Sequence, residues 1–220
     1  MLLLALDTAS AAVSVALHDG DSVLVARAGE PSPRHVELLT PLVSQALAEI
    51  GATAADLTAV AAGVGPGPFT GLRVGLVSAR TFAFALGVDV LGVCSLDAVA
   101  AGAVADGFTE PEFLVATDAR RREVYWARYR LDPGAARPVR IDGPYVALPA
   151  DVPRKELPVV GRGGDLYPDL LGPARLPLDP PAAALADLAV HGEPYVLPAE
   201  PLYLRRPDAG MPGARKRVTP

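Results

Sequence analysis

Few folds accommodate the order in which apolar segments follow one another in the first 105 residues. Short runs with strand-like alternation come first, and runs with helical spacing then alternate with buried-strand runs. We expect strands at residues 2–6, 13–17, 22–28, 57–64 and 88–93, and helices at residues 32–50, 72–86 and 95–105. This βββαβαβα order predicts an α/β fold, in which a three-stranded meander extends into a mixed sheet covered by helices.

Local signals predict where the helices begin. Ser32 is expected to cap the first helix, with Pro33 in its first turn. Pro41 lies inside the same pattern, so the helix either kinks there or begins at Thr40. Ser95 is expected to cap the third helix.

The sequence after residue 105 is less regular. Two strand-like runs, 113–117 and 123–131, flank a tight polar stretch and predict a hairpin. Prolines interrupt the rest, where we expect a strand at 157–160 and a short helix at 181–190. The predicted organisation is an N-terminal subdomain of residues 1–105, a smaller and degenerate α/β half of residues 106–203, and a disordered tail of residues 204–220.

Composition and charge exclude several classes of protein. The 220 residues carry a net charge of −5, so nucleic acid would have to be bound by a local basic patch or through a partner. The single cysteine, Cys94, rules out an internal disulfide, and the three histidines do not stand at metal-ligand spacing. The N-terminal run lacks a positive region, and the apolar run 82–88 is too short to cross a membrane. We therefore expect a cytoplasmic protein without a metal or a membrane span.

Two segments have the composition of a nucleotide site. Asp7, Thr8 and Ser10 place a carboxylate and two hydroxyls in the turn after the first strand, where magnesium and phosphates can be held. The same residue types also form ordinary turns by bonding their own backbone. The glycine-rich segment 63–75 lacks the P-loop lysine and the dinucleotide spacing, and two prolines remove amides that an anion would need. A rigid turn between strand and helix is therefore the favoured interpretation of this segment.

The second helix carries small residues four apart, at Gly71, Gly75, Ala79 and Ala83. Apolar area beside this stripe comes from Leu72, Leu76 and Phe82. A stripe of small residues allows another helix to approach closely. From the residues alone, packing of this face on the chain's own sheet is the favoured alternative.

Arginine and aromatic residues are interleaved around the predicted hairpin. They are Arg120, Arg121, Arg122, Tyr125, Trp126, Arg128, Tyr129 and Arg130. Such a cluster can bind RNA by charge and stacking, although a solvated charged face over packed aromatic rings is the favoured alternative. Strand alternation places Tyr125 and Ala127 on one face of the sheet and Trp126 and Arg128 on the other.

Five segments stand in one order along the chain: LALDTASAAVSVAL at 4–17, HVELLTP at 35–41, GVGPGPFTGLRVGL at 63–76, Ser95-Leu96, and TDARRREVYWARY at 117–129. Together with EPLYLRRP at 200–207, they resemble the bacterial TsaB (YeaZ) family over nearly the whole chain. Members of that family are partners in making the threonylcarbamoyl modification of the adenosine beside the tRNA anticodon.

The resemblance implies an actin-like ATPase domain of the ribonuclease H-like class. It also implies a non-catalytic scaffold subunit that binds the metal-bearing subunit TsaD, with TsaE as the ATPase that joins them and tRNA contacted only indirectly. The H-x-x-x-H metal pair of the catalytic relative is absent from this sequence. Without TsaD, the bare helix face is expected to form a homodimer.

In that family the first two helices contact TsaD. The implied interface therefore comprises His35, Leu39, Leu42, Gly71, Leu72, Gly75, Leu76, Ala79 and Ala83. The resemblance leaves at most weak ATP or ADP binding, at the partner interface.

Two other functions remain as alternatives. An autonomous nucleotide phosphotransferase of the sugar-kinase type would use Asp7, Thr8 and Ser10. An M22-like peptidase would need a catalytic site that the sequence does not assemble. One departure from the family pattern is Pro68, which stands where the family has serine and so lacks a hydroxyl and an amide donor.

Overall fold

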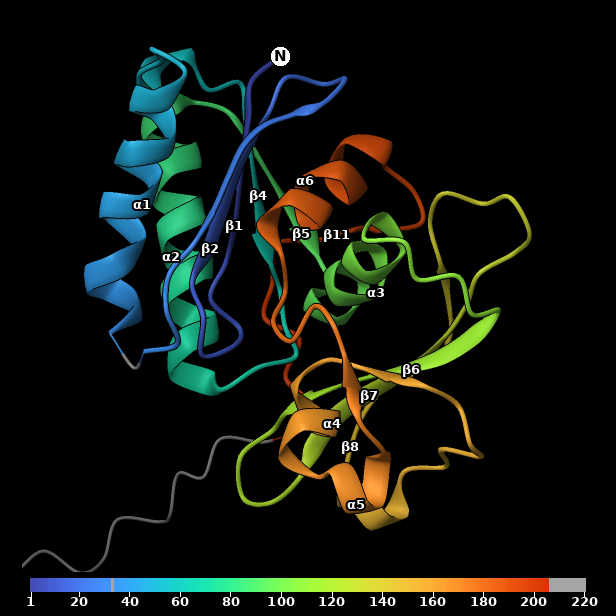
Figure 1. Ribbon diagram of the computed structural model, residues 1–220. Coiled ribbons are helices and arrows are strands. Elements are labelled where there is room, and N and C mark those ends of the chain that lie inside the picture. The colour runs from blue at the N-terminus through green and yellow to red at the C-terminus, as the bar shows by residue number, and fades with distance from the viewer. Residues whose placement is uncertain (33, 206–220) are drawn as a thin grey trace, which may run out of the picture.

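The computed structural model describes residues 1–32 and 34–205, which form two β-sheets with helices packed on them (Figure 1). The strands of the first sheet are β1 (Leu3–Asp7), β2 (Ser14–His18), β3 (Val23–Ala28), β4 (Ala59–Gly63), β5 (Asp89–Val93) and β11 (Val196–Leu197). Those of the second are β6 (Glu112–Asp118), β7 (Val124–Arg130), β8 (Val139–Ala147), β9 (Val159–Val160) and β10 (Ala174–Arg175). The α-helices are α1 (His35–Glu49), α2 (Phe69–Leu86), α3 (Ser95–Ala105), α4 (Arg162–Leu166), α5 (Pro168–Leu171) and α6 (Ala182–His191).

The first sheet has the predicted topology. Its strand order is β11-β5-β4-β1-β2-β3, with β1, β2 and β3 pairing as an antiparallel meander and β1, β4 and β5 running parallel. The parallel strands are joined through α1 and α2, as parallel strands require a crossover. The fold is therefore of the expected α/β class, with a meander continued by parallel strands.

Helices cover both faces of the first sheet. Figure 1 shows α1 and α2 side by side on one face and α3 and α6 on the other. Leu4 and Leu6 of β1 belong to the core under α1 and α2, whereas Leu3 and Ala5 pack in the core with α6. Since successive side chains of a strand point to opposite faces, a strand buried on both sides is apolar throughout, as β1 is up to Asp7.

The helix α3 connects the two sheets. Ala98 and Ala101 pack in the core of the first sheet, and Leu96 and Val99 pack in a separate core with Phe113 of the second sheet. A helix that is apolar on all sides is buried on all sides, which fits its position between the sheets. The other face of the second sheet is covered by the segment that contains α4 and α5.

Two predictions about helix starts were wrong. The helix α1 begins at His35 with Arg34 as its N-cap, so Ser32 does not cap it and Pro41 lies within it. The predicted position of Pro33 lies outside the described residues. Ser95 is the first residue of α3 rather than its cap, because its hydroxyl bonds the Asp7 carboxylate instead of the helix backbone.

The predicted boundary at residue 105 does not separate the two sheets. Both α6 and β11 come from the second half of the chain, yet they pack on the first sheet or join it. The short helix expected at 181–190 is α6, and the predicted hairpin is formed by β6 and β7. Of the predicted tail, Leu204 and Arg205 are described, and residues 206–220 lie outside the described residues.

The helix α2 has the length and hydropathy of a membrane span. Its 18 residues reach a mean hydropathy of 1.2, although they include Arg73 and Arg80. Core helices meet the same criterion, and the buried face of α2 packs against β4 and α1. Packing within the chain therefore accounts for its apolar residues on that face.

Candidate functional site

The predicted nucleotide turn begins with a buried carboxylate. Asp7 ends β1 and is fully buried. Its Oδ2 accepts a hydrogen bond from the Ser95 hydroxyl at 2.6 Å, and its Oδ1 accepts one from the Ala9 amide at 2.7 Å. Burial raises the pKa of Asp7 to about 6, although both hydrogen bonds oppose that shift. The carboxylate thus holds the turn against α3.

The two hydroxyls of the turn are also bonded within the chain. Thr8 is only 2% exposed, and its hydroxyl donates to the Gly71 carbonyl at 2.7 Å. The Ser10 hydroxyl donates to the Ala12 carbonyl at 3.1 Å. Of the three predicted nucleotide ligands, Ser10 alone lines the cleft described below. The polar groups of Asp7 and Thr8 are therefore bonded within the chain, as those of ordinary turn residues are.

The glycine-rich segment packs on this turn. A Cβ atom at Gly67 would lie 2.4 Å from the Ala9 carbonyl oxygen, so only glycine permits this approach. The Gly65 amide donates to the Ser95 hydroxyl at 3.2 Å, and the Tyr125 hydroxyl donates to the Gly67 carbonyl at 3.4 Å. These contacts fit the predicted rigid turn between β4 and α2.

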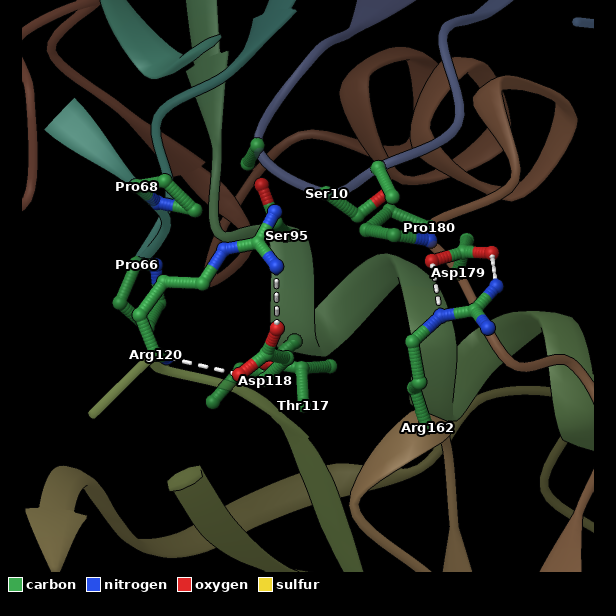
Figure 2. A pocket seen from close by; sticks show the side chains of 13 residues that line it. Ser10, Pro66, Pro68, Ser95, Thr117, Asp118, Arg120, Arg162, Asp179 and Pro180 are labelled. Carbon is green, nitrogen blue, oxygen red and sulfur yellow. Dashed lines mark hydrogen bonds and ion pairs between the residues drawn. The ribbon is translucent and has the colours of Figure 1, made fainter. Parts of the chain in front are cut away.

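A narrow cleft with a volume of about 20 Å³ lies between the two sheets. In Figure 2, Pro66 and Pro68 lie near Arg120 on the left, and Ser10 lies near Asp179 and Arg162 on the right; both arginines come from the second half of the chain. Other residues that line the cleft are Ala9, Ala11, Ser95, Leu96, Thr117, Asp118, Asp179 and Pro180. This volume is far below that of small-molecule sites, which are about 300–1,000 Å³.

The charged groups of this cleft form ion pairs. Arg120 lies 3.0 Å from Asp118, and the Arg162 Nε donates to Asp179 at 3.1 Å while a second guanidinium nitrogen bonds the other carboxylate oxygen (Figure 2). Arg162 and Asp179 have no signal in the sequence, since they are isolated charges that only the tertiary fold brings to the Ser10 turn. Both arginines of the cleft are therefore paired with carboxylates within the chain.

The hairpin confirms the predicted alternation of its strand. Tyr125 and Ala127 pack in the core with α3, and Trp126 packs on the opposite face with Val152. The turn itself carries Arg120, Arg121 and Arg122, all exposed. The hairpin therefore has exposed charges over packed aromatic rings, which is the interpretation favoured from the sequence.

The residues predicted to meet a partner are mostly buried within the chain. Leu39, Gly71, Leu72, Gly75, Leu76, Ala79 and Ala83 all belong to buried positions of α1 and α2. A Cβ at Gly75 would lie 2.4 Å from the Thr8 hydroxyl oxygen, so the small stripe serves close packing on the chain's own sheet. Leu42 is half-buried, and His35 bonds the Ser10 carbonyl through Nε2 at 2.7 Å. Most residues of the predicted interface therefore pack within the chain, and the interface itself stays a prediction.

The exposed sides of α1 and α2 carry large apolar residues among polar ones such as Arg80 and Thr81. Val36 is 69% exposed, Val77 62% and Phe84 91%. We call Val36, Val77 and Phe84 the outer apolar face; they point away from the sheet because the buried stripe points toward it. The prediction based on small residues four apart did not include these positions. Large apolar residues on an exposed helix face are themselves a signal of a contact site.

A buried polar cluster lies away from the cleft. The Tyr129 hydroxyl donates to Asp97 at 2.7 Å, and Arg140 lies 3.6 Å from Asp97 and 3.3 Å from the Cys94 sulfur. Burial raises the pKa of Asp97, and it raises the pKa of Cys94 to about 12. A thiol with so high a pKa is protonated at neutral pH and is not a nucleophile, as the buried position of Cys94 predicted.

The histidines have structural partners. The Nδ1 of His18 accepts the Gly20 amide at 2.9 Å, and His191 packs against Tyr195. Within residues 1–32 and 34–205, no group of three histidine, cysteine or acidic residues could hold a metal ion. Peptidase chemistry of the Ser-His type would need a histidine that faces a hydroxyl, whereas His35 faces a backbone carbonyl.

Comparison with known proteins gives consistent matches. The family model described as TsaD, tRNA N6-adenosine threonylcarbamoyltransferase, matches residues 30–139. A protein of Mycobacterium tuberculosis is 46% identical over 210 residues, which are 94% of this chain and 92% of that protein. TsaB of Escherichia coli, a tRNA threonylcarbamoyladenosine biosynthesis protein, is 40% identical over 134 residues. That alignment covers 60% of this chain and 56% of the E. coli protein.

Solved structures agree with these matches. YeaZ from Pseudomonas aeruginosa superposes with a TM-score of 0.79 at 31% identity, covering 92% of this chain and 99% of that one. Another crystal structure, of a P. aeruginosa protein described as similar to peptidase YeaZ, gives a TM-score of 0.79 at 32% identity and covers 93% and 99%. In sequence, the chain spans 56% of a Mycobacterium leprae relative that is 44% identical.

Proposed function

The chain belongs to the TsaB (YeaZ) family, and we propose that it is the non-catalytic subunit that binds TsaD in the transfer of a threonylcarbamoyl group to tRNA. The family-model match with TsaD supports a common architecture for the two subunits, since it spans the segment from α1 to β7. Relatives named as tRNA threonylcarbamoyladenosine biosynthesis proteins support the pathway. The modified base is the adenosine beside the anticodon.

The observation that carries the proposal is the outer apolar face. Phe84, at 91% exposure, and Val77, at 62%, stand on a helix whose opposite face is already buried in the core. Exposed large apolar residues of this kind mark protein contact sites. We assign the TsaD contact to this face of α1 and α2, in place of the buried small-residue stripe. A homodimer through the same face is the proposed state of the chain without TsaD.

The contribution of this subunit is structural. The polar groups of Asp7 and Thr8 form hydrogen bonds within the chain, and the cleft arginines are paired with Asp118 and Asp179. These contacts support a role without chemistry of its own and with at most weak ATP or ADP binding at the partner interface. TsaE, the ATPase that joins the two subunits, and a cytoplasmic location complete the proposal.

Co-purification with TsaD tests this function. Phe84→Asp places a charge in the proposed contact and should abolish the complex, while the 91% exposure of Phe84 means that folding should be unaffected. Leu170→Asp is the matched control, because Leu170 is an exposed apolar residue, 51% exposed, on α5 of the other half. Wild-type protein and Leu170→Asp should both retain TsaD. A complex that survives Phe84→Asp would refute the assigned face, and absence of any complex would refute the function.

A further inference from the structure

The C-terminal segment of the described chain is fixed to the turn between β6 and β7. A guanidinium nitrogen of Arg205 donates to the Ala119 carbonyl at 3.0 Å, and the same side chain forms an ion pair with Glu123. Ala119 and Glu123 flank the three exposed arginines of the turn. Two arginine-bearing segments that are more than 80 residues apart in sequence therefore meet at one place.

The turn holds its arginines in an unusual backbone conformation. The φ angles of Arg120, Arg121 and Arg122 are 59°, 56° and 62°, in the left-handed region that non-glycine residues rarely adopt. The Asp118 carboxylate accepts the Arg120 amide at 2.7 Å, and the Glu123 amide donates to the Arg120 carbonyl at 3.0 Å, which maintains the turn. Glycine or asparagine would form this turn at lower cost. The arginine side chains are therefore not explained by the needs of the turn.

An exposed aromatic stack lies on the same C-terminal segment. Tyr203 stacks on Phe69 with 5.3 Å between ring centroids and an interplanar angle of 27°. The Arg73 guanidinium lies 3.6 Å from the Phe69 centroid, and its Nε donates to the Tyr203 hydroxyl at 3.0 Å. Tyr203 is 38% exposed and Phe69 37%, so both rings retain surface for a further contact.

We propose that these groups form an RNA-binding track, defined as Arg120, Arg122 and Arg205 with the Phe69–Tyr203 stack. Cations bind the phosphates and the aromatic pair takes an unstacked base, the combination by which proteins bind single-stranded or looped RNA. An acidic protein surface would use the charges but not the rings, which favours RNA. The inference rests on the proposed function, in which tRNA is the substrate, and it replaces the expectation that tRNA is contacted only indirectly.

Sequence beyond the track continues its charge. Residues 206–220 contain Arg206, Arg215, Lys216 and Arg217 and a single acid, Asp208, in a chain whose net charge is −5. Such a basic segment on an acidic protein is typical of nucleic-acid contacts.

The test measures the affinity of unmodified tRNA for the complex of this chain with TsaD, by fluorescence anisotropy over a range of salt concentrations. Arg120→Asn combined with Arg122→Asn removes two cations, and asparagine tolerates the left-handed conformation. Arg130→Gln combined with Arg175→Gln removes the same charge from exposed positions of β7 and β10 outside the turn. The first pair should weaken binding and reduce the slope of log K against log salt by about 1.5, at 0.7–0.9 for each phosphate contact. The control pair should leave the slope unchanged.

Two further arms decide between outcomes. Tyr203→Leu should lower tRNA affinity without changing the salt slope, since it removes stacking and no charge. If both arginine-pair variants lose the same affinity for tRNA, the RNA assignment is overturned. It is also overturned if a polyglutamate peptide displaces labelled tRNA as strongly as unlabelled tRNA does. Complex formation is measured first by size-exclusion chromatography. A failure to bind TsaD would contradict the proposed function and not the RNA-binding track. Binding of tRNA to the chain alone then still tests the track.

Discussion

Replacing Gly75 by alanine should destabilise the protein, although the same change usually stabilises a helix. Alanine in a helix interior is favoured over glycine by about 0.5–1 kcal/mol. Here the new methyl group would lie 2.4 Å from the Thr8 hydroxyl oxygen and 3.4 Å from a Leu6 methyl carbon. The Thr8 hydroxyl has little room to retreat, because Thr8 is 2% exposed and bonds the Gly71 carbonyl at 2.7 Å.

The expected loss follows from these contacts. Overpacking a filled core costs about 1–3 kcal/mol, and displacing the Thr8 hydroxyl loses a hydrogen bond of about 1 kcal/mol. Together they exceed the helix-propensity gain, so the free energy of unfolding should fall by about 1–3 kcal/mol. For a chain of this size, the melting temperature should drop by about 2–4 °C for each kcal/mol.

Denaturant unfolding of a double-mutant cycle provides the assay. Thr8→Ala removes the clashing oxygen, so Gly75→Ala should cost much less in that background than in the wild type. Ser78→Ala, a half-buried position of the same helix, controls for propensity and should be neutral or stabilising. If Gly75→Ala alone stabilises the protein, or if the two changes are additive, the close packing of α2 on the Asp7 turn is refuted.

Three other outcomes follow from the structure. Burial raises the pKa of Asp7 to about 6 from 3.8, so the folded state binds more protons than the unfolded state between these values. Wild-type stability should therefore fall by about 2 kcal/mol relative to Asp7→Asn as the pH rises from 4 to 6. A pH-independent difference in urea unfolding would contradict this. Tyr129→Phe leaves buried Asp97 without its hydroxyl donor and should cost about 1–3 kcal/mol in thermal unfolding, whereas no loss would show that the bond is not formed. Calorimetry of the isolated chain with ATP and magnesium should show weak or no heat of binding, and tight binding with turnover would favour the phosphotransferase alternative.

The first sheet could be predicted from sequence because its signals are local. Strand alternation at 13–17 and the apolar run before Asp7 depend on nearest neighbours along the chain, and the observed register agrees with them. The sequence analysis did not predict β8, because the strand contains Pro144 and proline is expected to interrupt a strand. Since β8 is the edge of its sheet, proline is tolerated there without the loss of a ladder bond. The two-residue strands β10 and β11 are too short to produce any pattern.

The candidate site was harder to predict because it depends on which surfaces meet. The spacing of Gly71, Gly75, Ala79 and Ala83 predicted a close contact, and the contact exists, but spacing alone cannot tell a strand of the same chain from a partner helix. Likewise, the turn signature of Asp7 does not reveal that Ser95 takes up its carboxylate. Long-range pairs such as Arg205 with Glu123 have no signal in a single sequence.

The central claim is that this chain acts through the outer apolar face of α1 and α2 on TsaD and performs no chemistry itself. A reconstituted assay with TsaD, TsaE, tRNA and the activated threonylcarbamoyl donor measures this most directly, as threonylcarbamoyl incorporated into tRNA. Incorporation should require both this chain and TsaD, should be lost with Phe84→Asp, and should persist with Leu170→Asp. Incorporation by this chain without TsaD, or full activity of Phe84→Asp, would contradict the account.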